Sequence, residues 1–131
     1  MKISFDFDNT LSKKICQETA KFLIEKGFDV CITTSRYKVK EGFNKLNEDL
    51  FSIAEKLNIK DITFTNFQDK TSFLVQNNVD IHIDDDSYEL ESLQNTSIIG
   101  IQIKSPQWRK KLFKILSLEE SNFLYETTRK S

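Results

Sequence analysis

The sequence predicts an α/β fold in three layers, with helices on both faces of a five-stranded, mainly parallel sheet. Short apolar segments alternate five times with segments of helical character along the 131 residues, which is typical of a parallel sheet. The expected strands are mostly apolar rather than alternating, as strands buried on both faces usually are. Ile, Leu, Val and Phe make up 41 residues, enough for a packed core. We expect one domain over residues 1–131, in which 119–131 form a C-terminal helix or tail.

The first part of the chain is expected to form a strand, a helix and a second strand. Residues 3–5 are a short apolar run, and residues 15–26 follow with helical spacing. The apolar side of this helix carries Ile15, Phe22 and Leu23. Gly27 stands where the helix is expected to end, and the apolar run 30–32 is the second strand.

The middle of the chain contains the clearest helix, over residues 43–57. Its apolar residues recur at spacings of three and four. They are Phe43, Leu46, Leu50, Ile53, Ala54 and Leu57. The segment 61–65 is expected to be the third strand, residues 70–76 a short helix, and residues 79–83 the fourth strand.

The last part of the chain supplies the fifth strand and three helices. Residues 87–93 are expected to form a short helix and residues 97–103 the fifth strand. A closing helix is lined by Trp108, Leu112, Ile115 and Leu116. Ser117 and Glu120 are spaced as in a capping box, which predicts a final helix from there toward Thr127.

The composition excludes several classes of protein. A net charge of −1, from 19 basic and 20 acidic residues, excludes a histone-like protein and an acidic tail. Cys16 and Cys31 form no zinc-binding motif, and two free thiols favour a reducing compartment. No apolar segment approaches the roughly 18 residues of a membrane span, and the first residues do not resemble a signal peptide. We therefore expect a cytoplasmic protein without a membrane segment.

Polar residues follow the ends of four expected strands. In chain order they are Asp6, Asp8 and Thr10; Thr34, Ser35 and Arg36; Lys70; and Asp84 with Asp85. Because ligands of parallel sheets bind beyond the carboxyl ends of the strands, we expect these side chains to lie together. A group of carboxylates is unfavourable unless a cation neutralises it. Mg²⁺ fits, since it is a hard ion that binds carboxylates together with the phosphate of a substrate.

The order of these residues resembles the haloacid dehalogenase (HAD) superfamily of phosphotransferases. The residues that match the four family motifs are Asp6, Asp8 and Thr10 for DxDxT; Thr34 for a strand ending in Thr or Ser; Lys70 for a helix-opening Lys; and Asp84 with Asp85 for the final acidic pair. The resemblance spans residues 3–86. It implies a Rossmann-like domain of HAD type that hydrolyses phosphate monoesters.

The resemblance also implies roles for the acidic residues. Asp6 would be the nucleophile that carries an aspartyl phosphate. Asp8 would protonate the leaving oxygen and then activate water, and its presence favours phosphate esters over dehalogenation, because a halide leaves without a proton. Mg²⁺ would bind Asp6, the backbone carbonyl of Asp8 and Asp84, with Asp85 acting through water.

The remaining matched residues would bind the phosphate. Thr34 would donate a hydrogen bond to the phosphoryl oxygens, and Lys70 would balance the charge of nucleophile and phosphate. We expect Thr10, Ser35 and Arg36 to be further phosphate or substrate contacts.

The spacing of the motifs leaves no room for an inserted cap domain. Asp6 and Thr34 are 28 positions apart and Thr34 and Lys70 are 36 apart, and each interval is used by one helix and one strand. An open site suits a phosphorylated substrate that is itself large, a lid from a second subunit, or a small substrate held by the basic loop 36–42. The second and fourth motifs are similar to those of nucleotidase-like and polynucleotide-phosphatase-like members. Together with the capless site, an amphipathic tail containing Phe123, Leu124 and Tyr125 makes a homo-oligomer plausible.

Receiver domains also carry Asp, Thr and Lys at strand ends. In receiver domains the paired acids come on the first strand, before Thr and Lys, so the order here excludes a receiver. A catalytically silent metal- or phosphate-binding module stays open, as does association with nucleic acid through the basic residues of 104–114. We expect Trp108 in the core, His82 in the core or on a strand, and Asp86 and Glu89 as acids at a helix N-terminus.

Overall fold

The fold is taken from a computed structural model, which describes residues 1–39 and 44–129. Five parallel strands form one sheet in the order β3-β2-β1-β4-β5. The strands are β1 (Lys2–Phe5), β2 (Asp29–Thr34), β3 (Ile62–Phe64), β4 (Ile81–Asp84) and β5 (Ile99–Gln102). The helices are α1 (Lys14–Glu25), α2 (Glu48–Leu57), α3 (Thr71–Gln76), α4 (Ser87–Glu91), α5 (Trp108–Ile115) and α6 (Glu120–Arg129).

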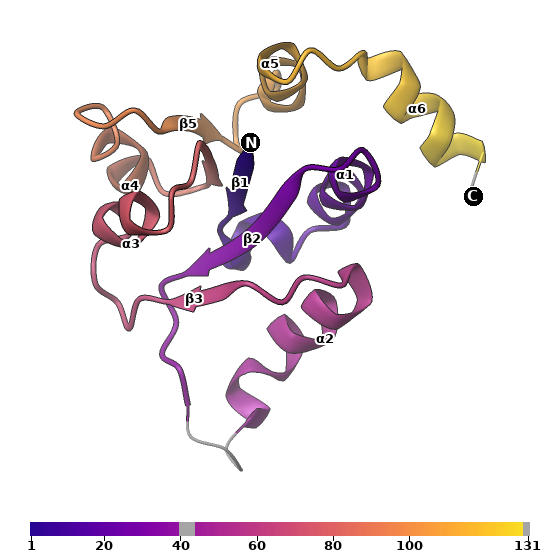
Figure 1. The fold of residues 1–131 in the computed structure, drawn as a ribbon. Helices are drawn as coiled ribbons and strands as arrows, with labels where there is room; N and C mark the ends of the chain where they lie inside the picture. Colours follow the sequence, from indigo (N-terminus) through magenta and orange to yellow (C-terminus); the bar gives the residue numbers. More distant parts are fainter. Residues whose placement is uncertain (40–43, 130–131) are drawn as a thin grey trace.

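The predicted α/β fold with a five-stranded parallel sheet is confirmed. Helices α3 and α4 lie on one side of the sheet and α1 and α2 on the other (Figure 1). The order is that of a Rossmann-like fold, in which the chain runs outward from β1 to β3 and then returns to place β4 on the other side of β1. The direction of winding therefore switches between β1 and β4, where such sheets bind ligands.

The two faces of the sheet differ in chemistry. One face carries large apolar side chains that belong to the main core: Ile3, Phe5, Ile32, Ile81, Ile83 and Ile101. The opposite face carries Ser4, Cys31, Thr33, His82 and Gly100. The expectation of mostly apolar strands without alternation was therefore wrong for this face. Its buried polar groups pair with each other, as where the Ser4 hydroxyl lies 2.7 Å from that of Thr33.

Small residues let the helices pack closely on this second face. A Cβ at Gly100 would lie 3.0 Å from Cδ2 of Leu90 on α4. Leu74 of α3 and Leu93 pack beside Cys31 in a second, smaller apolar cluster. Helices α3 and α4 thus lie directly over the polar residues that lead to the strand ends.

Two predicted helices begin in a different place or face a different way. On α1, Ile15 is exposed, and the buried side consists of Cys16, Thr19, Ala20, Phe22 and Leu23. Phe22 and Leu23 are buried as predicted, whereas Ile15 is not, and the rest of the buried side was missed because Cys, Thr and Ala were not counted as core residues. The helix predicted over 43–57 begins only at Glu48, after a 3-10 turn at Asn44–Asn47 that leaves Leu46 exposed. Phe43 lies outside the described residues.

Four helices end in the same hydrogen-bonding pattern, the Schellman motif. Each of these helix ends has a left-handed residue, and these residues are Gly27, Asn58, Asn78 and Ser117. After α5, for example, the Ser117 N–H donates to Lys114 O and the Leu118 N–H to Phe113 O. Ser117 therefore ends α5, and the predicted capping box for the last helix is wrong.

The C-terminal helix packs back onto the domain. The Phe123 ring is buried between Phe22 of α1 and Phe113 of α5, with ring centroids 5.4 and 5.6 Å away. Arg109 of α5 donates a hydrogen bond to Glu120 at 2.8 Å. Phe123 is thus not available as an oligomer contact, and the homo-oligomer stays a prediction. Within the described ranges, no helix has both the length and the apolar character needed to cross a bilayer.

Candidate active site

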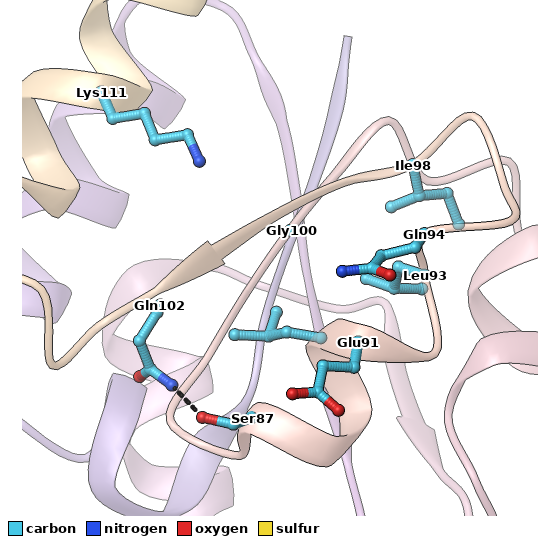
Figure 2. A pocket seen from close by; sticks show the side chains of 9 residues that line it. Ser87, Glu91, Leu93, Gln94, Ile98, Gly100, Gln102 and Lys111 are labelled. Atoms are coloured by element: carbon cyan, nitrogen blue, oxygen red, sulfur yellow. Dashed lines mark hydrogen bonds between the residues drawn. The ribbon is translucent and has the colours of Figure 1, made fainter.

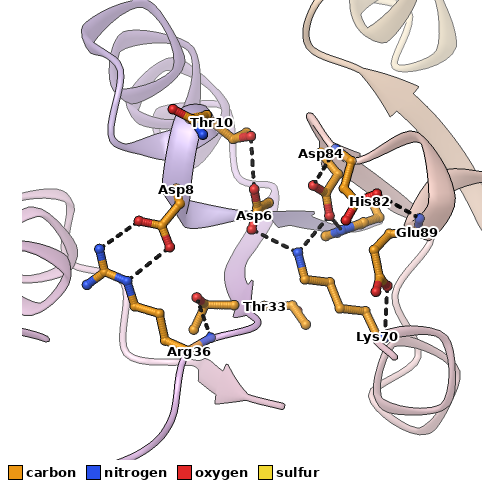
Figure 3. A network of polar contacts seen from close by, with 12 residues as sticks. Asp6, Asp8, Thr10, Thr33, Arg36, Lys70, His82, Asp84 and Glu89 are labelled. Atoms are coloured by element: carbon orange, nitrogen blue, oxygen red, sulfur yellow. Dashed lines mark hydrogen bonds and ion pairs between the residues drawn. The ribbon is translucent and has the colours of Figure 1, made fainter. Parts of the chain in front are cut away.

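Several of the predicted site residues meet between β1 and β4, where the direction of winding of the sheet switches. Asp6 directly follows β1, and its N–H donates to the Ile83 carbonyl at 2.9 Å, so the ladder between β1 and β4 continues past the strand end. Asp84 is the last residue of β4. Figure 3 shows the Lys70 side chain reaching between the two carboxylates.

Lys70 is the centre of the site. Its Nζ lies 2.8 Å from Asp6 Oδ1 and 2.7 Å from Asp84 Oδ2. The three residues are 2%, 5% and 0% exposed, so two buried carboxylates share one ammonium group. The backbone N–H of Lys70 donates to Glu89 Oε2 at 2.9 Å, which fixes the start of the Lys70 side chain.

The pKa values reflect this shortage of positive charge. Burial would lower the pKa of Lys70, but the charges of Asp6 and Asp84 outweigh burial and raise it. Burial raises the pKa of Asp6 to about 8; Lys70 opposes the shift and the charge of Asp84 adds to it. Burial acts in the same direction on Asp84, but its hydrogen bond with His82 and the charge of Lys70 hold the pKa of Asp84 below its usual range.

A divalent cation fits the residues that meet here. Asp6, Asp84 and Asp85 each offer one oxygen, and these oxygens lie within 4.8 Å of one another. Carboxylate oxygens are ligands that Mg²⁺ accepts, and the raised pKa of Asp6 indicates that another positive charge would be favourable. The Asp8 carboxylate is not part of this group.

The turn after β1 orients Asp6. The Thr10 hydroxyl donates to Asp6 Oδ2 at 3.2 Å, and the Leu11 N–H donates to the Asp6 carbonyl at 3.1 Å. Asn9 is left-handed, with φ 59°, a conformation that Asn tolerates better than most residues. Thr10 thus contacts Asp6, and its predicted contact with phosphate or substrate stays a prediction.

Arg36 lies at the other side of the site and is held by two carboxylates. Its Nε and Nη2 donate to Asp8 at 3.0 and 2.7 Å, and its Nη1 and Nη2 donate to Asp49 at 2.7 and 3.0 Å. Nη1 also reaches Asn47 at 3.4 Å, so all five N–H donors are used. The Arg36 guanidinium further lies 4.9 Å from the centroid of the Phe7 ring. In this structure Arg36 therefore positions Asp8, where a phosphate contact was predicted.

Thr34 and Ser35 shape the loop that follows β2. Thr34 is buried, and its hydroxyl oxygen accepts the Arg36 N–H at 3.2 Å. The Ser35 carbonyl accepts the Phe67 N–H at 2.7 Å. Lys38 and Val39 of the predicted basic loop belong to the described residues, but 40–42 lie outside them. Phosphate binding by Thr34 and Ser35 stays a prediction.

Three further residues support the site; the sequence did not single out Asp49, whereas Glu89 and His82 lie where they were expected, in the first turn of α4 and buried in β4. Asp49 helps to hold Arg36, and Glu89 holds the backbone of Lys70. His82 is fully buried, with Nε2 2.8 Å from Asp84 Oδ2; burial lowers the pKa of His82, so we assign a neutral ring that donates from Nε2. Its position two residues before Asp84 was a usable signal, because alternate residues of a strand share a face.

Two other residues have the roles expected of them. Asp86 caps α4 by accepting the N–H groups of Tyr88 and Glu89, and its own N–H donates to Asp84 Oδ1 at 3.0 Å. Trp108 is buried in the main core. The acid at the helix N-terminus and the core Trp are both confirmed.

A cavity of about 380 Å³ lies beside the edge strand β5, away from the acidic residues described above (Figure 2). It is lined by Ser87, Leu90, Glu91, Leu93, Gln94, Ile98, Gly100, Gln102 and Lys111. Gln102 links it to the acidic cluster by donating to the Asp85 carbonyl at 3.2 Å and to the Ser87 hydroxyl at 3.0 Å. Its lining has one acid and one base, so the carboxylates at β1 and β4 are the better candidate for chemistry.

Comparisons of the chain with protein-family models and with curated proteins found no match. What the site can do therefore follows from its own residues.

Proposed function

We propose that the protein is a Mg²⁺-dependent phosphohydrolase of HAD type, which cleaves phosphate monoesters through an aspartyl phosphate on Asp6. The observation that carries the proposal is the buried Lys70 ammonium shared by Asp6 and Asp84, at the point where the winding of the sheet reverses. The four motifs that resemble the HAD superfamily support it, since these three residues occupy three of them.

Asp6, Asp84 and Asp85 would hold the metal, with the Asp8 carbonyl as a further ligand by resemblance. When bound, Mg²⁺ would neutralise negative charge between the carboxylates and the phosphate of the substrate. Lys70 contributes a second positive charge from the protein itself. Together these charges would allow a carboxylate to approach an anionic phosphoryl group.

In the first step, an Asp6 oxygen forms a bond to phosphorus while the bond to the leaving oxygen breaks. Thr10 and Lys70 each hold one oxygen of Asp6, so the nucleophile is oriented before the substrate arrives. Asp8 gives its proton to the leaving oxygen. Asp8 is about half exposed and is paired with Arg36; to act as the acid it would take up a proton and exchange a hydrogen bond from Arg36 for one with the substrate.

In the second step, water attacks the phosphorus of the aspartyl phosphate. Asp8, now a carboxylate, takes a proton from this water, and the bond between phosphorus and Asp6 breaks. Inorganic phosphate leaves with Asp6 restored as a carboxylate and Asp8 protonated, so the cycle is balanced.

Turnover of p-nitrophenyl phosphate in Mg²⁺ buffer and after chelation tests the proposal. We expect Mg²⁺-dependent release of nitrophenol, no turnover by Asp6→Asn, and a strong loss of Mg²⁺ affinity in Asp84→Asn. Asp86→Asn is the matched control, since Asn also caps helices and Asp86 is not in the metal cluster. Full activity after chelation, or in Asp6→Asn, contradicts the mechanism. A protein that binds Mg²⁺ and phosphate without turning over any ester is the silent binding module instead.

A further inference from the structure

We propose that Tyr37 and Phe67 form a stacking platform for a nucleobase, and that the substrate therefore contains a nucleoside monophosphate. This inference rests on the proposed phosphohydrolase function and adds the class of substrate to it. The nucleotide would be free or would be the terminal unit of an oligonucleotide. In both cases the phosphate would lie at Asp6 and the base on the two rings.

The first observation is an exposed aromatic pair. Tyr37 is 58% exposed and Phe67 is 68% exposed, and their ring centroids lie 4.9 Å apart. Single exposed apolar residues are common on proteins, but two adjoining aromatic rings offer a π surface of the kind on which bases stack.

The second observation is the backbone of Phe67. Asn66 and Phe67 are both left-handed, with φ 54° and 62°. Asn is often found in this region, whereas a bulky residue such as Phe is an outlier there. Strained backbone of this kind persists when its surroundings hold it and is concentrated at functional sites.

The third observation is how firmly this loop is held. The N–H groups of Thr65, Asn66 and Phe67 donate to the carbonyls of Thr34, Arg36 and Ser35 at 2.9, 3.2 and 2.7 Å. The Lys38 N–H donates to Asn66 Oδ1 at 3.0 Å. These bonds continue the pairing of β2 and β3 beyond the strand ends, so both rings are presented by an ordered backbone.

The position of the platform connects it to the site. Tyr37 follows Arg36, whose guanidinium donates hydrogen bonds to Asp8. The Phe67 N–H donates a hydrogen bond to the carbonyl of Ser35, which follows Thr34 of the second motif. The rings thus extend from the same edge of the sheet as Asp6 and Asp84. Lys38, which is exposed beside Tyr37, adds positive charge for the next phosphate when the nucleotide is the end of an oligonucleotide.

The experiment compares adenosine 5′-monophosphate with ribose 5-phosphate, which keeps the phosphate and sugar and lacks the base. We expect kcat/KM to be higher for the nucleotide. Tyr37→Ala or Phe67→Gly should lower kcat/KM for the nucleotide about 5- to 30-fold, the lower part of the range for loss of base stacking, and leave ribose 5-phosphate unchanged. Tyr37→Phe and Phe67→Trp should retain the preference.

Two features keep the variants interpretable. Gly adopts positive φ without strain, so Phe67→Gly should not lower Tm. Phe51 and Phe64 are the control pair, with centroids 5.9 Å apart on α2 and β3, and Phe51→Ala should leave the preference for the nucleotide unchanged.

Saturation-transfer NMR with adenosine tests the platform without catalysis. If adenosine binds the wild type and this binding is lost in Phe67→Gly, the stacking platform is supported, even if the protein hydrolyses no ester. A lack of ester hydrolysis would contradict only the phosphohydrolase proposal. Equal kcat/KM for nucleotide and ribose 5-phosphate, unchanged in Tyr37→Ala and Phe67→Gly, overturns the platform and leaves the hydrolase. If kcat/KM is higher for a 5′-phosphorylated oligonucleotide than for the mononucleotide, and Tyr37→Ala or Phe67→Gly lowers it, the substrate is the end of a nucleic acid.

Discussion

Replacing Lys70 by Met tests how the charges of the site are balanced. Met is unbranched like the Lys stem and carries no charge, so Lys70→Met removes the ammonium group with little change in packing. Asp6 and Asp84, both buried, are then left without their shared partner.

The size of the effect follows from the geometry. Burial and the charge of Asp84 already raise the pKa of Asp6 to about 8 beside Lys70, so without the ammonium group Asp6 takes up a proton and Asp84 keeps an unpaired buried charge. Removing one member of a buried ion pair costs about 3–5 kcal/mol. In metal-free buffer we expect the free energy of unfolding to fall by about 3 kcal/mol, which lowers Tm by roughly 10 °C in a domain of this size.

Thermal and urea unfolding followed by circular dichroism measure this change, in EDTA and in Mg²⁺. Mg²⁺ should raise the Tm of Lys70→Met more than that of the wild type, because the cation replaces the missing charge. Adding Asp84→Asn should restore part of the stability. Exposed Lys56 on α2 provides the control variant, Lys56→Met. Wild-type stability of Lys70→Met in EDTA, or no recovery in the double variant, would refute the reasoning.

Three further predictions concern other parts of the chain. Asp8→Asn should slow hydrolysis of an alkyl phosphate roughly 10²- to 10⁴-fold. With p-nitrophenyl phosphate the same variant should still give a burst of nitrophenol, with phosphate trapped on Asp6. Equal losses of activity on both esters, without trapped phosphate, would contradict an acid/base role of Asp8. Ser117→Gly should raise the free energy of unfolding by about 1 kcal/mol, because Ser117 has φ 57° and Gly relieves the cost of the left-handed conformation; a lower urea midpoint would count against this account of the end of α5. Burial raises the pKa of Cys16 to about 12 and that of Cys31 to about 11, so a thiol reagent at neutral pH should label neither until the protein unfolds, and rapid labelling of the folded protein would show that these thiols are accessible.

The sheet and the meeting of its acidic residues could be predicted because they depend on local patterns. Apolar runs give the strands, and parallel strands bring Asp6 and Asp84 to one edge whatever the loops do. The full buried side of α1 was less predictable, since Cys16, Thr19 and Ala20 are buried by tertiary packing that composition does not reveal.

The partners of the site residues could not be predicted from spacing. Arg36 was expected to contact phosphate, but its guanidinium donates hydrogen bonds to Asp49, which lies 13 positions further along the chain. That contact depends on how the 3-10 turn and α2 pack after a loop, which no periodicity encodes. Ser117 was assigned to the start of one helix and belongs to the end of another, because a capping box and a Schellman end can share the same residues.

The central position of β1 has a consequence for folding. Asp6 and Asp84 are 78 positions apart, and β1 cannot complete its pairing until β4 has been synthesised. Until then the acidic side chains stay hydrated, and the unpaired edge of β1 is exposed, as in slow-folding parallel sheets. A ribosome-bound chain ending before β4 should therefore be sensitive to protease, and protection should appear only when the second carboxylate reaches Lys70.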